Sequence, residues 1–196
     1  MSDQPRTAIN TRSGLSLDFQ DPSPASIKLE DIAGGLSLAP RFGGQAKRFR
    51  SVAEHAICVA KLVEEMGFSE LALAALHHDS HEAYACDVPK PLKTLLEPAY
   101  SEITDRLDRA IATALGLAVL DLKSEAARPI KEADDVLLVL EAEEYLAGDP
   151  PNPAMNPEVL DLARETIDVK QALSPDDARK AFLASHEALS ASGLGQ

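Results

Sequence analysis

The sequence contains no tryptophan, and aromatic residues make up only 4% of its 196 residues. Alanine and leucine dominate instead, which favours helix over sheet. No apolar run approaches the roughly 18 residues of a membrane-spanning helix. The segment Met1–Arg6 lacks a basic region followed by an apolar stretch, so we expect no secretory leader. Two cysteines, Cys58 and Cys86, are too few for a disulfide framework, and a reducing cytoplasm is the expected location.

Basic residues are also scarce. The 19 lysines and arginines face 32 aspartates and glutamates, which gives a net charge of −13. Such a charge repels a phosphate backbone, so a nucleic-acid polymer is not an expected partner. One basic cluster without intervening acids is formed by Arg41, Lys47, Arg48 and Arg50. It suits a small anionic ligand, and a solvated basic loop is the alternative.

The spacing of apolar residues predicts an all-α helical bundle with a short extended N-terminal segment. Prolines and a glycine in residues 5–28 predict an extended or hairpin entry. Helices are expected over about 29–38, from Ser51 to Gly67, and over 98–116, 129–147, 157–172 and 175–191. Ser51 and Glu54 fit a capping box. A proline-rich linker at 148–153 separates the main unit, residues 1–148, from C-terminal helices within 149–196 that are expected to pack on it.

Ionisable side chains interrupt two apolar segments. His55 lies on the apolar stripe of its helix, where a lone histidine is more often a core residue than a ligand. His78, Asp79 and Glu82 follow the all-apolar run Leu71–Leu76. If that helix continues for one more turn, the three side chains project from one side of it.

Buried ionisable groups are costly unless they are paired or bound to a metal. Imidazole combined with carboxylate suits a divalent transition metal such as Co, Mn, Zn, Ni or Fe. A fourth ligand could come from the segment 131–135, where Asp134 and Asp135 are adjacent. Consecutive helical side chains point in different directions, so one of the two is expected to face the core, and spacing alone leaves both open.

Five short segments occur in a fixed order over about residues 7–145. They are Arg41-Phe42, Ser51-Val-Ala-Glu-His55, Leu76-His-His-Asp-Ser-His-Glu-Ala-Tyr84, Asp87-Val-Pro-Lys-Pro-Leu-Lys93 and Lys131-Glu-Ala-Asp134. This set resembles the HD-domain metal-dependent phosphohydrolases, which carry the pattern H…HD…D. It is most similar to the single-domain 5′-deoxynucleotidases and to nucleotide hydrolases encoded by phages and prophages.

The resemblance implies that His55, His78, Asp79 and Asp134 ligate the metal, and so it selects Asp134 over its neighbour. Glu82 would be the acid/base that orients or deprotonates the attacking water. The other histidines of the motif region and the tail, His77, His81 and His186, have no assigned role and are interpreted as solvent-facing or as neighbours of the ligands.

The resemblance also implies a substrate site. Arg41 would hold the phosphate, with Lys93 near it. Asp87 would face the sugar and help to favour a 2′-deoxyribose. Phe42 stands where the bacterial deoxynucleotidases have a larger aromatic residue. Glu141 could neighbour this site or lie on the surface.

The expected function is the release of phosphate from deoxynucleoside 5′-monophosphates by a cytoplasmic enzyme, which the resemblance implies is a homodimer. A triphosphohydrolase acting on a dNTP such as dATP is the first alternative, in which Lys47, Arg48 and Arg50 would match the additional phosphates. A non-catalytic nucleotide-binding regulatory module is the second. Glu82 argues against it, because a pure binder does not need a proton-handling carboxylate.

Overall fold

The chain opens with a small antiparallel hairpin in an otherwise all-α fold. The computed structural model describes residues 5–117, 124–151 and 155–192. Within them, β1 (Ala8–Asn10) pairs with β2 (Ser16–Asp18), and Ile9 lies opposite Leu17. Leu17 is fully buried, so the hairpin covers one edge of the core. The extended entry predicted for the N-terminal segment is confirmed.

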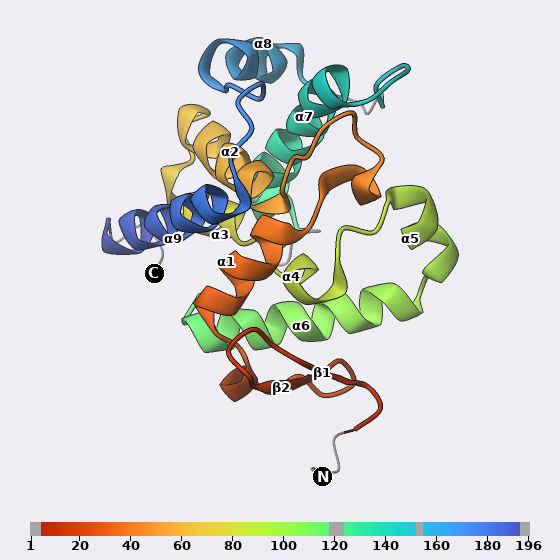
Figure 1. Cartoon of the computed structure of the whole chain (residues 1–196). Helices are drawn as coiled ribbons and strands as arrows, with labels where there is room; N and C mark the ends of the chain where they lie inside the picture. The colour runs from red at the N-terminus through yellow and green to blue at the C-terminus, as the bar shows by residue number, and fades with distance from the viewer. Residues whose placement is uncertain (1–4, 118–123, 152–154, 193–196) are drawn as a thin grey trace.

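The remaining elements are helices, and Figure 1 shows the hairpin at one end of the molecule with α7 and α8 at the other. Their bounds are η1 (Pro24–Ser26), α1 (Leu29–Leu38), η2 (Arg41–Gly44), α2 (Val52–Glu65), η3 (Ser69–Leu71), α3 (Ala72–Leu76), α4 (Glu82–Ala85), α5 (Lys90–Leu96), α6 (Ala99–Leu115), η4 (Glu125–Ala127), α7 (Arg128–Tyr145), α8 (Pro157–Thr166) and α9 (Pro175–Ala191). Within these described ranges no helix is long and apolar enough to cross a bilayer.

Helix α2 is the centre of the fold and packs against α1, α3, α7, α8 and α9. Its first turn carries the predicted capping box, in which Ser51 Oγ accepts from the Glu54 amide and Glu54 Oε2 accepts from the Ser51 amide. These two bonds satisfy amide groups that a helix start leaves without partners. The buried stripe of α2 includes Val52, Val59 and Val63, and His55 lies on the same face with no exposure.

The helix before His78 does not continue for the additional turn that would place His78, Asp79 and Glu82 on one helical face. Helix α3 ends at Leu76, a turn covers residues 77–81, and the short helix α4 starts at Glu82. The ring Nδ1 of His78 lies 2.7 Å from the carbonyl oxygen of Ala75, which therefore has a hydrogen-bond partner at the end of the helix. This contact ties the His78 side chain to the last turn of α3.

The C-terminal helices pack on the rest of the chain. Helix α9 lies against α1, α2 and α3, and α8 lies against α7 and α2. The helix expected over 157–172 ends earlier, at Thr166, and residues 167–174 form a connecting segment without helix. Part of the predicted 148–153 linker lies outside the described residues.

Candidate metal centre

Four side chains from three parts of the chain meet at the centre of the bundle. Helix α2 supplies His55, the turn after α3 supplies His78 and Asp79, and α7 supplies Asp134. His55 Nε2 lies 3.1 Å from Asp134 Oδ1, and His78 Nε2 lies 3.1 Å from Asp79 Oδ2 and 3.9 Å from Asp134 Oδ1. The structure thus brings together three of the residues expected to ligate a metal, His55, His78 and Asp134, and places the fourth, Asp79, against His78.

The donor atoms of this group fit a transition-metal ion. One ligand atom from each of His55, His78 and Asp134 lies within 4.8 Å of the others. His78 Nε2 is buried, and its 3.1 Å ion pair with Asp79 Oδ2 does not have the geometry of a hydrogen bond. Each ring uses its Nδ1 elsewhere, on the Ala75 carbonyl or the Glu141 carboxylate, which leaves Nε2 facing the cluster. Such hydrogen bonds commonly orient imidazole ligands.

The pKa values of these residues follow from burial and from their proximity. Burial by itself lowers the pKa of His78, but the Asp79 carboxylate more than offsets it and the pKa rises to about 9. Burial raises the pKa of Asp134, yet the hydrogen bond to His55 and the charge of His78 hold it well below its usual range. Without metal, a proton on His78 thus balances nearby carboxylate charge, and metal binding would displace that proton.

Asp134, and not its neighbour, faces the histidines. The side chain of Asp135 instead forms an ion pair with Lys131 one turn earlier on α7. The structure therefore separates the two aspartates that residue spacing left equivalent.

Glu82, at the start of α4, is 1% exposed and lies beside this cluster. A carboxylate oxygen of Glu82, a carboxylate oxygen of Asp79 and a ring nitrogen of His81 lie within 4.8 Å of one another. Its Oε1 accepts from Lys93 Nζ at 2.9 Å, whereas its buried Oε2 has no hydrogen-bond partner among the described residues. Burial, together with Asp79 and Asp87, raises the pKa of Glu82 to about 7, and Lys93 opposes that rise. Lys93 is expected near the phosphate, and in the structure its ammonium group binds the Glu82 carboxylate.

Arg41 and Phe42 lie in a strained turn that Asp87 fixes. Arg41 is 6% exposed, and its Nη1 lies 3.9 Å from Asp87 Oδ2. The amide of Phe42 donates to the same oxygen at 2.9 Å. Phe42 has a φ of 59°, in the left-handed region that residues other than glycine seldom adopt. Asp87 therefore holds the turn that positions the Arg41 guanidinium.

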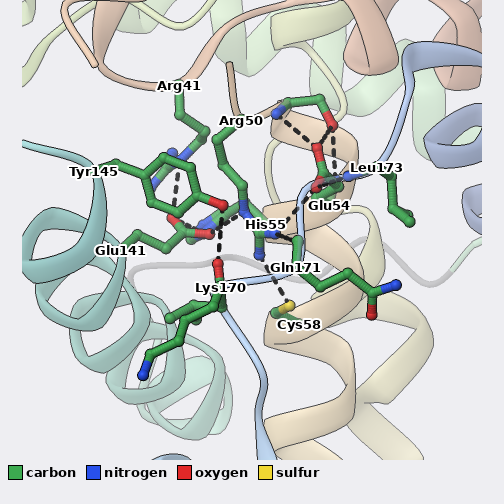
Figure 2. A network of polar contacts seen from close by, with 12 residues as sticks. Arg41, Arg50, Glu54, His55, Cys58, Glu141, Tyr145, Lys170, Gln171 and Leu173 are labelled. Atoms are coloured by element: carbon green, nitrogen blue, oxygen red, sulfur yellow. Dashed lines mark hydrogen bonds and ion pairs between the residues drawn. The ribbon is translucent and has the colours of Figure 1, made fainter. Parts of the chain in front are cut away.

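Glu141 is the main member of the site whose position the sequence left open. It has no exposure, so the surface alternative is wrong. Figure 2 shows it between two arginines and a histidine. Glu141 Oε2 lies 3.2 Å from Arg41 Nε and 3.0 Å from His55 Nδ1, and Oε1 lies 3.2 Å from Arg50 Nε. Burial raises its pKa, but the opposing charges of His55 and the arginines lower it to about 2.

Of the basic residues at 47–50, Arg50 is buried, whereas Lys47 and Arg48 are exposed, and both arginines form ion pairs with acidic side chains. Arg50 is 2% exposed and pairs with Glu54 at 3.0 Å as well as with Glu141. Arg48 pairs with Glu144 at 2.7 Å and lies over the ring of Tyr145. Neither a free phosphate-binding patch nor a simple solvated loop describes these two residues. A pattern of charge in the sequence could not reveal acidic partners on α2 and α7.

Of the unassigned histidines, His77 and His81 are buried, so the solvent-facing alternative is wrong for these two, and His186 is partly buried. His77 contacts Ser80 Oγ through Nδ1 and His186 Nδ1 through Nε2, each at 2.8 Å. His81 Nδ1 lies 3.0 Å from Asp108 Oδ1. These rings connect the turn at residues 77–81 to α9 and α6. Both helices are distant in sequence, so no local pattern predicts these contacts.

Comparison with known proteins identifies two relatives. RCAP_rcc00048 of Rhodobacter capsulatus, described as an uncharacterized protein, is 40% identical over 141 residues, which cover 69% of this chain and 71% of that protein. YfdR of Escherichia coli K12, also described as uncharacterized, is 37% identical over 133 residues, covering 68% of this chain and 69% of its own length. No family model matches the chain.

Proposed function

The chain belongs to the family of YfdR and RCAP_rcc00048, and from the site that this member carries we propose that it is a metal-dependent phosphohydrolase of nucleotides. The specific reaction proposed is the hydrolysis of deoxynucleoside 5′-monophosphates to deoxynucleosides and phosphate. The observation that carries the proposal is Glu82, a buried carboxylate that lies with Asp79 and His81 and whose Oε2 has no hydrogen-bond partner among the described residues. The resemblance of the motifs to HD-domain phosphohydrolases supports it.

The residues divide the chemistry among them. A divalent metal held by His55, His78, Asp79 and Asp134 would supply Lewis acidity toward the phosphoryl group and a water molecule. Glu82 Oε2 accepts a proton from the attacking water, and a pKa of about 7 suits both accepting it and passing it on. Arg41 neutralises charge on the phosphoryl oxygens, since it is fixed before substrate arrives.

The internal ion pairs favour a monophosphate over a triphosphate. A triphosphate carries additional charge that needs cationic partners, and the nearest candidates in sequence were Lys47, Arg48 and Arg50. Arg50 is buried against Glu54 and Glu141, and Arg48 is paired with Glu144. All three nitrogens of Arg50 are bonded within the protein, to Glu141, Glu54 and Cys58, whereas Arg41 uses its Nε on Glu141 and has its Nη1 3.9 Å from Asp87. Arg50 is therefore the costlier of the two to redirect toward a substrate.

Screening the metal-loaded protein against nucleotides tests this function. The protein, loaded with Co²⁺ or Mn²⁺, is incubated with each dNMP, NMP and dNTP, and the released product is identified. We expect phosphate from deoxynucleoside monophosphates and little turnover of ribonucleotides. Release of triphosphate from a dNTP would establish the alternative activity, and nucleotide binding without turnover would indicate a regulatory module. The variant His78→Ala controls for contaminating phosphatases.

We also propose that the protein acts in the cytoplasm as a homodimer. Three leucines of α5 are exposed to solvent at 47%, 81% and 44%, and they are Leu92, Leu95 and Leu96. Neighbouring exposed apolar side chains of this kind often mark a contact surface. Light scattering at micromolar concentration should give the mass of two chains, and a monomer would refute the dimer without bearing on the chemistry.

A further inference from the structure

One carboxylate joins the two functional arms of the site. Glu141 Oε2 lies 3.0 Å from the Nδ1 of the metal ligand His55 and 3.2 Å from the Nε of Arg41. The same oxygen atom therefore contacts the residue that would bind metal and the residue that would bind phosphate. These contacts come from α2 and from the η2 turn, and they meet on α7.

The contact to His55 decides which ring nitrogen is available. A carboxylate flanked by two guanidinium groups accepts hydrogen bonds and does not donate them. His55 must then carry a hydrogen on Nδ1, and its Nε2 points toward Asp134 and the other ligands. A fixed ring with the correct nitrogen exposed requires less reorganisation when a metal binds.

Glu141 is itself held in place by residues outside the site. Its Oε1 accepts from Arg50 Nε, and Arg50 Nη1 bonds to Glu54 and to the carbonyl oxygen of Gln171 (Figure 2). Glu54 in turn accepts from the amide of Leu173 at 2.9 Å. The connecting segment 167–174 therefore supports Glu141 indirectly, through the contacts of Gln171 with Arg50 and of Leu173 with Glu54.

We propose that Glu141 is a positioning residue that sets both the metal ligand His55 and the phosphate-binding Arg41. Losing it weakens metal binding and phosphate binding together, because both His55 and Arg41 lose the carboxylate that orients them. The roles of His55 and Arg41 in this inference rest on the proposed function.

The variant Glu141→Gln tests the proposal, with Asp31→Asn as its control. Both changes remove a buried carboxylate charge, but the side-chain hydrogen bonds of Asp31 are to Ser13 and involve neither His55, Arg41 nor Arg50. Co²⁺ affinity is measured by calorimetry and by the visible spectrum of the bound ion. We expect affinity to fall about 10- to 100-fold in Glu141→Gln, with an altered spectrum, and to stay near the wild-type value in Asp31→Asn.

Inorganic phosphate gives a second measurement that does not depend on turnover. At saturating Co²⁺, we expect phosphate affinity to fall about tenfold in Glu141→Gln because Arg41 loses its fixed orientation. Wild-type affinities for both ligands, or equal losses in the two variants, would overturn the proposal. If Glu141→Gln does not fold, Glu141→Asp keeps the charge but shortens the side chain, and the same losses are expected. A wild-type protein that binds Co²⁺ and phosphate but hydrolyses no nucleotide would refute the proposed function alone.

Discussion

Glu82 combines deep burial with an oxygen that remains free to react. A buried carboxyl group normally resists ionisation, and here the charges of Asp79 and Asp87 add to that resistance. Lys93 opposes both effects through its bond to Oε1. The balance places the titration of Glu82 near neutral pH, where a proton acceptor works best.

Replacing Glu82 by glutamine should separate metal binding from turnover. Glutamine keeps the shape of the side chain but cannot take a proton, so we expect turnover to fall about 10²- to 10⁴-fold. Metal analysis should show unchanged content, because the four proposed ligands are intact. Glu102→Gln, an exposed change on α6, serves as the control. A near-wild-type rate would mean that Glu82 is structural.

The pH dependence of turnover should report the same carboxyl group. If Glu82 must be ionised, activity is low below its pKa of about 7 and rises to a plateau above it. Lys93 lowers that pKa, so Lys93→Met should move the midpoint of the profile to higher pH. Lys90→Met, an exposed change on the same helix, should leave it in place. A midpoint that does not move in Lys93→Met would show that a group other than Glu82 sets the pH profile.

At the scale of elements, the crossing of α1 and α4 positions Glu82. A Cβ atom placed on Gly35 would lie 2.5 Å from the carbonyl oxygen of Ala83, the residue after Glu82. The backbone of α1 can approach α4 this closely only because residue 35 has no side chain. The position of Glu82, the proposed proton acceptor, therefore depends on a glycine in a different helix.

The paired variants Gly35→Ala and Gly34→Ala test this crossing. The methyl group of Gly35→Ala would push the backbones of α1 and α4 apart. We expect a loss of about 1–3 kcal/mol in the free energy of unfolding. A Cβ on Gly34 would instead meet the side chain of Arg12 at 2.9 Å, and Arg12 is exposed and can move. Helix propensity then favours alanine by up to about 1 kcal/mol, so Gly34→Ala should be neutral or stabilising. Chemical denaturation measures both, and equal effects would contradict a specific crossing.

For the whole molecule, the metal-free protein should be most stable near pH 6.5. The folded-state pKa of His78 is raised to about 9, so its contribution is complete below the unfolded value of about 6.5 and is lost as pH rises through 9. Burial lowers the pKa of His77 to about 3, so stability also falls as pH decreases from about 6.5 toward 3.

Thermal melting in the presence of a chelator checks this dependence. The melting temperature should pass through a maximum near pH 6.5 and decrease toward both pH 9 and pH 4. In His78→Ala the alkaline decrease should become smaller, because the main group that loses a proton there is gone. An alkaline limb of equal slope in that variant would show that other groups cause it.

The sequence by itself determined those features that depend on local order. The capping box of Ser51 and Glu54, the start and end of α1 and the hairpin entry follow from residues close together in the chain, and the structure has them as expected. The histidines and carboxylates of the candidate centre were also identifiable, because polar groups within apolar runs need a partner.

Only the tertiary structure decided how those groups are supported. Arg41 and Glu141 are 100 residues apart, and Arg50 and Glu141 are 91 apart, so no local spacing predicts their contact. The same holds for Asp134 and Asp135, of which α7 turns only Asp134 toward His55 on α2. Local residue order specifies which side chains can bind a metal or move a proton. The packing of distant helices specifies their orientation and their charge.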